Sequence, residues 1–132
     1  HQDLRVENGI RFGDEIDGVN FDYAAKLTAL NAVALASMAW APAPPEDLEI
    51  EGSVSADTTL RWRKVKSAVA YKVYWRLTTE PQWHWSRMLG DVDSVTLKNV
   101  VIDNYFFGVA SVNEDGIESP VVFPGPIGSF RY

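Results

Sequence analysis

Hydrophobic residues follow two different patterns along the chain, and the change falls near Pro42. Between Asn20 and Ala41 the sequence is rich in alanine and leucine, and no charged residue occurs between Lys26 and Glu46. Alanine and leucine favour helix, whereas the Val, Tyr, Trp and Thr residues that dominate the second half favour strands. The pattern therefore predicts one long helix followed by a β domain.

The expected helix has a start signal and a stop signal. Asn20 is a good N-cap, because its side-chain oxygen can accept a hydrogen bond from a backbone N–H of the first turn. Pro42, Pro44 and Pro45 prevent the helix from continuing beyond Ala41, because proline lacks the N–H donor and disfavours helical geometry in the residue before it. The helix is expected to end at Ala41.

The apolar residues of this helix surround most of its circumference and do not form a single stripe. Its uncharged run of about fifteen residues is shorter than the roughly 20 that a bilayer requires, so no membrane span is expected. One edge of a sandwich cannot cover such a helix. We expect the helix to be an interior element of a domain that this sequence lacks. Without that domain it is expected to self-associate through residues 21–41, to pack across the β domain or to stay partly disordered.

The second half contains short runs of β-branched and aromatic residues between turn signals, as expected for a small antiparallel sandwich. In one run Tyr71, Val73 and Trp75 alternate with polar or charged positions, which predicts one core face and one solvent face. Seven strands are predicted, at residues 48–54, 58–65, 71–78, 83–89, 94–100, 105–113 and 120–124.

The order of these motifs resembles the fibronectin type III domain over about residues 44–125. The motifs are Pro42-Ala43-Pro44-Pro45, Leu60-Arg61-Trp62, Tyr71-Lys72-Val73-Tyr74-Trp75, and Leu97 followed by Tyr105, Val109, Asn113 and Gly116. The resemblance implies a mainly β, seven-stranded, immunoglobulin-like antiparallel sandwich preceded by one long helix. It also implies that Trp62 lies in the core and that the Tyr105 hydroxyl bonds back to the backbone as a tyrosine corner. Ser111 departs from the family, which often has alanine there.

The first forty residues carry a second resemblance. His1 to Gly9, then Phe12-Gly13-Asp14, then Val19 to Tyr23 and the alanine-rich helix are similar to the C-terminal end of zinc exopeptidases of the M28 aminopeptidase family. The resemblance implies that residues 1–41 are the C-terminal loop and helix of a peptidase domain and that residues 42–132 form the fibronectin type III-like domain. It further implies that His1 is a zinc ligand in an intact parent enzyme, which is a secreted or periplasmic hydrolase.

Composition narrows the chemistry of the chain itself. The 132 residues carry a formal net charge of -6, the wrong sign for nucleic acid or anionic lipid. Without cysteine a thiolate site is impossible, and a Ser-His-Asp relay or a multi-histidine metal site would have to use His1 or His84, the two histidines of the sequence. We expect no catalytic residue and no cofactor in this chain, with zinc confined to the parent enzyme.

Two functions follow from these observations. The first is a non-catalytic part of an M28-like zinc aminopeptidase, whose sandwich stabilises or positions the peptidase domain; its partner is that domain. The second is a free-standing module that binds a glycan or a peptide through Trp83 and Trp85, which are expected on one strand face with His84 on the other. Ordinary packing of both indoles on the sandwich flank is the alternative.

Basic residues cluster in the predicted strands and could form a partner patch. The alternative interpretation is a solvent-exposed face of paired strands balanced by Glu49 and Glu51. The basic residues are Arg61, Arg63, Lys64, Lys66, Lys72 and Arg76.

Overall fold

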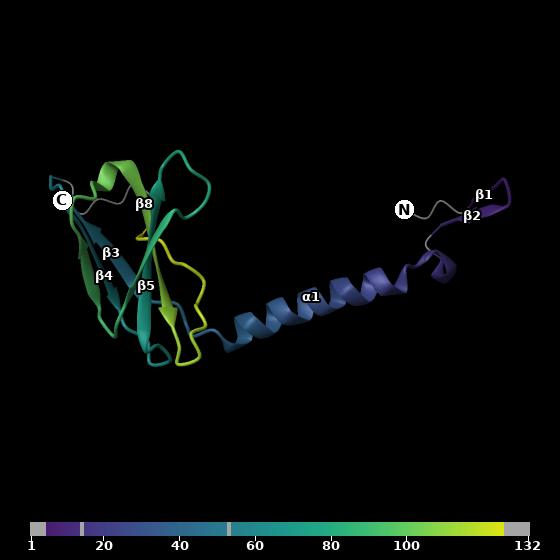
Figure 1. Cartoon of the computed structure of the whole chain (residues 1–132), viewed down its shortest axis with the longest axis horizontal. Coiled ribbons are helices and arrows are strands. Elements are labelled where there is room, and N and C mark those ends of the chain that lie inside the picture. Colours follow the sequence, from purple (N-terminus) through teal and green to yellow (C-terminus); the bar gives the residue numbers. More distant parts are fainter. Residues whose placement is uncertain (1–4, 14, 53, 126–132) are drawn as a thin grey trace. The chain divides into compact units, whose positions relative to one another are not determined.

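The chain divides into two compact units, residues 1–39 and residues 40–132, which are described separately (Figure 1). The computed structural model describes residues 5–13, 15–52 and 54–125. The sequence predicts a boundary between residues 41 and 42.

The first unit begins with a hairpin where the sequence predicted a loop. Strands β1 (Arg5–Glu7) and β2 (Ile10–Phe12) pair antiparallel around Asn8 and Gly9, whose φ angles are 51° and 79°. An Asn-Gly pair suits this turn, because both central residues of a type I′ turn need positive φ. The dipeptide was the signal that the sequence interpretation missed. A short 3-10 turn, η1 (Ile16–Gly18), follows.

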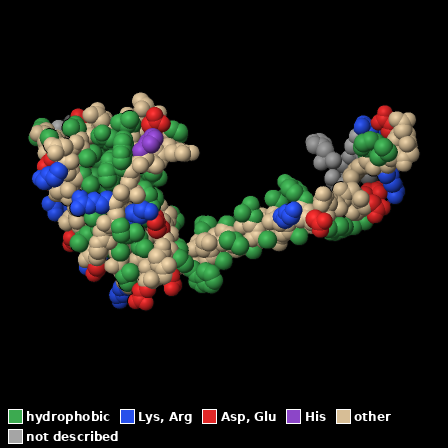
Figure 2. All heavy atoms as spheres, viewed as in Figure 1, with side chains coloured by type: hydrophobic (Ala, Val, Ile, Leu, Met, Phe, Trp, Pro, Cys, Tyr) green, Lys and Arg blue, Asp and Glu red, His purple; other side chains and the backbone are tan. Residues whose placement is uncertain are grey.

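Helix α1 (Phe21–Trp40) begins as the sequence predicted and ends one residue earlier. The backbone N–H of Tyr23 donates to Asn20 Oδ1 at 3.0 Å, which confirms the predicted N-cap. No residue of α1 is buried. Figure 2 shows hydrophobic side chains along its length. Among the residues that the structure describes, no helix has both the length and the apolar character needed to cross a membrane.

The described residues of the second unit, 40–52 and 54–125, form two three-stranded antiparallel sheets (Figure 1). In one, β4 (Thr58–Arg63) lies between β3 (Glu46–Glu51) and β7 (Ser94–Leu97). In the other, β5 (Ala70–Leu77) lies between β6 (Trp85–Leu89) and β8 (Tyr105–Val112). A 3-10 turn, η2 (Ile102–Asn104), precedes β8.

The hydrophobic core takes side chains from both sheets. Its buried members are Leu48, Leu60, Trp62, Tyr71, Val73, Leu97, Phe107 and Val109. The Trp62 and Tyr71 rings lie 5.4 Å apart between centroids, so the predicted core tryptophan packs directly against the central strand of the other sheet. Along β4 and the first half of β5, more deeply buried positions alternate with less buried, outward-facing ones, as the sequence pattern predicted.

Two details of the sandwich differ from the prediction. In place of a seventh strand at 120–124, the described residues form isolated bridges, Val109 with Val122 and Val112 with Glu118. Between these bridges Pro120 has no N–H to donate. There the Ser119 side chain, instead of a backbone carbonyl, accepts from the Ser111 N–H at 3.0 Å. The ladder is therefore interrupted.

The second difference concerns the expected tyrosine corner. The Tyr105 hydroxyl forms no hydrogen bond within the described residues; its ring instead packs edge-on against Trp85 at 5.7 Å. A hydroxyl-to-backbone bond is made by Tyr71, whose oxygen accepts from the Val65 N–H at 2.9 Å. Tyr71 is fully buried, so it fixes the turn between β4 and β5 from inside the core.

Gly108 on β8 provides the first test of the sandwich packing. A Cβ there would overlap Val121 Cγ1 and would lie 3.2 Å from both a Trp83 ring carbon and the Val122 carbonyl oxygen. We expect Gly108→Ala to lower the free energy of unfolding by about 1–3 kcal/mol through overpacking. Urea unfolding would measure the change. In Gly90→Ala, the matched control, the new methyl meets nothing within 4 Å; equal effects of the two substitutions would contradict this packing.

Candidate functional site

Trp83 and Trp85, the predicted ligand-binding pair, lie on opposite faces of the β6–β5–β8 sheet. Trp85 pairs with Trp75 across the β5–β6 ladder, whereas Trp83 contacts Tyr74. Neighbouring residues of a strand point to opposite faces, so the two indoles are separated by the sheet. The expectation that they share one face is wrong, because β6 begins at Trp85 and Trp83 lies in the loop before it.

Trp83 is half-buried in an aromatic and cationic cluster on the outer face of this sheet. Its ring centroid lies 5.8 Å from that of Tyr74 and 5.5 Å from that of Phe123. The Arg76 guanidinium lies over two rings, 5.6 Å from Trp83 and 4.6 Å from Phe106. Such cation–π contacts contribute about 0.5–1 kcal/mol each at exposed sites. Trp83 therefore packs on its own sheet, as the alternative interpretation expected.

Trp85 belongs to a second aromatic cluster, at the end of the inner face. It stacks on Trp75 with the rings 6.3 Å apart and nearly parallel, and its centroid is 5.5 Å from that of His84. Trp85 remains 41% exposed. One such surface could stack on a flat ligand, but Trp83 cannot contribute to the same contact. Ligand binding by these residues stays a prediction.

Lys72, Tyr74 and Glu118 form a half-buried polar network next to Trp83. Lys72 Nζ donates to Glu118 Oε1 at 2.8 Å, and the Tyr74 hydroxyl donates to Glu118 Oε2. Burial acts to raise the pKa of Glu118, but the bonds from Lys72 and Tyr74 outweigh it and the pKa is lowered. The pKa of Tyr74 is raised, chiefly by burial and then by its bond to the carboxylate. The network fastens the segment after β8 to the central strand.

Most of the basic residues singled out in the sequence have acidic partners. Figure 2 shows Lys and Arg side chains interspersed with hydrophobic ones on the sandwich. Arg61 pairs with Glu51 at 3.6 Å, Arg63 Nε with Asp47 at 2.9 Å, and Lys64 with Asp91 at 3.0 Å. These contacts support the interpretation of a balanced, solvent-exposed face, with Glu51 one of the two predicted partners.

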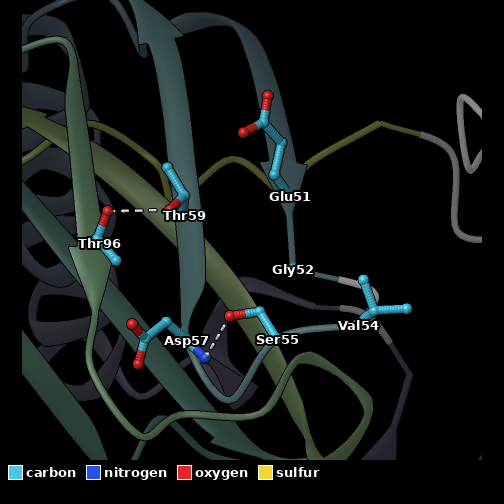
Figure 3. A pocket seen from close by; sticks show the side chains of 7 residues that line it. All are labelled: Glu51, Gly52, Val54, Ser55, Asp57, Thr59 and Thr96. Carbon is cyan, nitrogen blue, oxygen red and sulfur yellow. Dashed lines mark hydrogen bonds between the residues drawn. The ribbon is translucent and has the colours of Figure 1, made fainter.

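A shallow polar pocket of about 370 Å³ lies beside the loop that joins β3 to β4 (Figure 3). Its polar groups already have partners: Asp57 accepts from Lys98 Nζ at 2.6 Å and from the Asn99 N–H at 2.9 Å, and the Thr59 and Thr96 hydroxyls share a 2.9 Å bond. The bond from Lys98, followed by that from Asn99, lowers the pKa of Asp57. The pocket is lined by Glu51, Gly52, Val54, Ser55, Asp57, Thr59 and Thr96.

A zinc site does not fit the described residues. Across 5–13, 15–52 and 54–125, no three His, Cys, Asp or Glu side chains lie close enough together to hold a metal ion. His1, the predicted zinc ligand of an intact parent, lies outside the described residues.

The sequence interpretation missed the residues that hold the segment between α1 and β3. The buried Ser111 donates through Oγ to the Ala43 carbonyl at 2.5 Å. Asn113 Nδ2 donates to the Trp40 carbonyl at 3.0 Å. The one available signal was the serine at 111, where the fibronectin type III resemblance led us to expect alanine.

Comparison with solved structures defines the class of the fold. The chain is similar to a Fn3-like protein from Clostridium thermocellum, with a TM-score of 0.52 and 22% identity over 61% of this chain and 85% of that one. It is also similar to the twitchin kinase region of C. elegans, which contains a Fn3 domain, with a TM-score of 0.50 and 19% identity over 65% of this chain and 16% of that one. The mainly β, fibronectin type III-like fold predicted from sequence is confirmed.

Proteins with similar sequences share a name that is more specific than the fold class. A "Probable zinc metalloprotease" from Leptosphaeria maculans is 43% identical over 129 residues, which are 96% of this chain and 30% of that protein. Proteins of the same name from Pyrenophora tritici-repentis and Pyricularia oryzae are each 36% identical over 96% of this chain and 26% of their own length. The chain thus spans about a quarter to a third of these relatives. No protein-family model matches it.

The Glu118 network predicts a pH-dependent stability. Because the pKa of Glu118 is lowered by folding, its ionised form stabilises the sandwich at neutral pH, and this contribution is lost as the pH falls below the ordinary value of 4.5 and through the folded-state pKa. We expect Glu118→Gln to cost about 1–2 kcal/mol at pH 7 and less at pH 3. Urea unfolding at both pH values would measure this. A loss equal at both, or equal to that of Glu114→Gln on an exposed turn, would refute the role of the network.

Proposed function

We propose that this chain is the C-terminal part of a zinc metalloprotease of the M28 aminopeptidase type. In this proposal residues 42–132 are an accessory, non-catalytic module that stabilises or positions the peptidase domain. One observation carries the proposal: relatives named "Probable zinc metalloprotease" align with 96–99% of this chain, which accounts for only 26–31% of their length. The fibronectin type III-like fold of the second unit is consistent with an accessory role.

The proposal assigns the zinc chemistry to the rest of the parent protein. A bound zinc ion polarises a scissile carbonyl and lowers the pKa of its water. It needs about three protein ligands and an open position, a donor set that the described residues do not assemble. The assignment of His1 as one ligand rests on the M28 resemblance, as does a secreted or periplasmic location for the parent.

Helix α1 is proposed to belong to the body of the peptidase. Its large apolar side chains are exposed, among them Leu30, Leu35 and Met38 at 65%, 67% and 66%. Burying a side chain of this kind stabilises a protein by about 1.5–3 kcal/mol. A partner domain that packs around α1 would therefore gain several such contributions, and in this proposal that partner is the peptidase domain.

Peptidase assays test the assignment. We expect the complete protein to hydrolyse aminoacyl peptides in a reaction that chelators abolish and zinc restores, and the 132-residue chain with added zinc to be inactive. Removal of residues 42–132 from the complete protein should lower its melting temperature or its kcat/KM without abolishing hydrolysis. Activity of this chain alone, or a complete protein that is indifferent to chelators, would overturn the proposal; an unchanged truncated enzyme would remove the accessory role.

The same view of α1 predicts how the isolated chain behaves. With no partner domain present, its apolar surface leaves water by contact with a second copy. Sedimentation velocity should therefore show a concentration-dependent dimer or larger species for residues 1–132 and a monomer for residues 42–132. If both sediment as monomers while circular dichroism still reports the helix, α1 does not need a partner to cover it.

A further inference from the structure

The segment between α1 and β3 is bound to the sandwich along its length. The Ala43 carbonyl accepts from Ser111 Oγ at 2.5 Å, and the Ala43 N–H donates to Ser67 Oγ at 3.2 Å. Pro42 and Pro45 on either side are buried. Proline has a fixed φ, so two buried rings and two hydrogen bonds leave this segment little freedom. All of these residues belong to the second unit.

Asn113 holds the start of the segment. Its Oδ1 accepts from the backbone N–H groups of Asp115 at 3.1 Å and Ile117 at 2.9 Å, which orients the side-chain amide. Its Nδ2 then donates to the carbonyl of Trp40 at 3.0 Å. Trp40 is the last residue of α1, and the final carbonyls of a helix have no donor within the helix. The Asn113 amide therefore supplies the donor that the Trp40 carbonyl lacks, and both residues belong to the second unit.

Ser111 is fixed for its role by the strand around it. It is fully buried; its N–H donates to Ser119 Oγ at 3.0 Å and its carbonyl accepts from the Ser119 N–H at 2.9 Å. The side-chain hydroxyl is thus the only part of Ser111 available to the Ala43 carbonyl. An alanine at 111 would fit the strand equally well but would leave the Ala43 carbonyl without this donor. The hydrogen bond therefore gives a physical reason for a serine at 111, where the fibronectin type III family often has alanine.

We propose that residues 40–45, the joint, are fixed to the sandwich as part of the second unit, and that Ser111 and Asn113 are the positioning residues that hold them. The inference deepens the proposed function and rests on it for its use, since it makes the joint a part of the accessory module. A Pro-rich segment without such contacts would be a semi-rigid spacer free to turn at its ends. Here both ends of the joint are hydrogen-bonded to the sandwich or buried in it.

Asn113→Asp removes the hydrogen bond to Trp40 and keeps the two bonds that Asn113 accepts within its own turn. An aspartate keeps the Oδ1 acceptor for Asp115 and Ile117 but replaces the donor to Trp40 by an oxygen, and it places negative charge at a helix C-terminus. In the 132-residue chain we expect the amides of residues 37–41 to exchange about three- to tenfold faster, the loss expected for one hydrogen bond. The amides of Asp115 and Ile117 should keep their protection.

Ser111→Ala tests the other contact, with Thr59→Ala as a matched control that removes a strand hydroxyl bonded to Thr96 in the other sheet. Ser111→Ala should speed exchange of the Ala43 amide about three- to tenfold, and Thr59→Ala should not. In the unmodified chain, 15N relaxation should give Ala41 and Ala43 order parameters close to those of β8, about 0.85.

Two results would overturn the fixed joint. One is an Ala43 amide that exchanges as in an unstructured peptide, with order parameters below about 0.6 at residues 41 and 43. The other is unchanged exchange at residues 37–43 in both Asn113→Asp and Ser111→Ala. Either result would leave the metalloprotease assignment intact, because the peptidase assays decide that question independently.

Discussion

The sandwich depends on the central strand β5 being covered on both faces. Tyr71 and Val73 point inward and are fully buried, while Lys72 and Tyr74 point outward into the network with Glu118. Because side chains alternate strictly along a strand, a shift of one residue would move the charged residues into the core. The pairing of β5 with β6 and β8 is therefore set by its own sequence, and the aromatic clusters on each face follow from that register.

The outer face of β5 explains why the module does not present its tryptophans as a pair. Trp83 covers Gly108, where the neighbouring strand has no side chain to fill the surface. A large aromatic ring over a strand glycine restores the packing that the glycine lacks. The loop before β6 thus supplies a side chain to one face, and β6 itself supplies Trp85 to the other.

Local sequence patterns predicted most of the fold. The features that they did not predict depend on contacts between residues far apart in the sequence. The period-two runs predicted the strands, and Asn20 with the prolines predicted the limits of α1, because these signals act within a few residues. The interrupted seventh strand depends on Ser119 and Pro120 facing Ser111, which no local pattern expresses. The contacts of Ser111 with Ala43 and of Asn113 with Trp40 join residues 68 and 73 positions apart. Only the tertiary structure brings them together.

The two units differ in what they can do alone, and this difference bears on why they occur together. The sandwich buries its own core, whereas α1 has no buried residue. A sandwich joined by chance to a helix would not need to hold the intervening segment, yet the Trp40 and Ala43 carbonyls each receive a side-chain hydrogen bond from β8 or the turn after it. The relatives align with 96–99% of the chain, which includes both units. The two units therefore recur together in these relatives, although only the sandwich buries a core of its own.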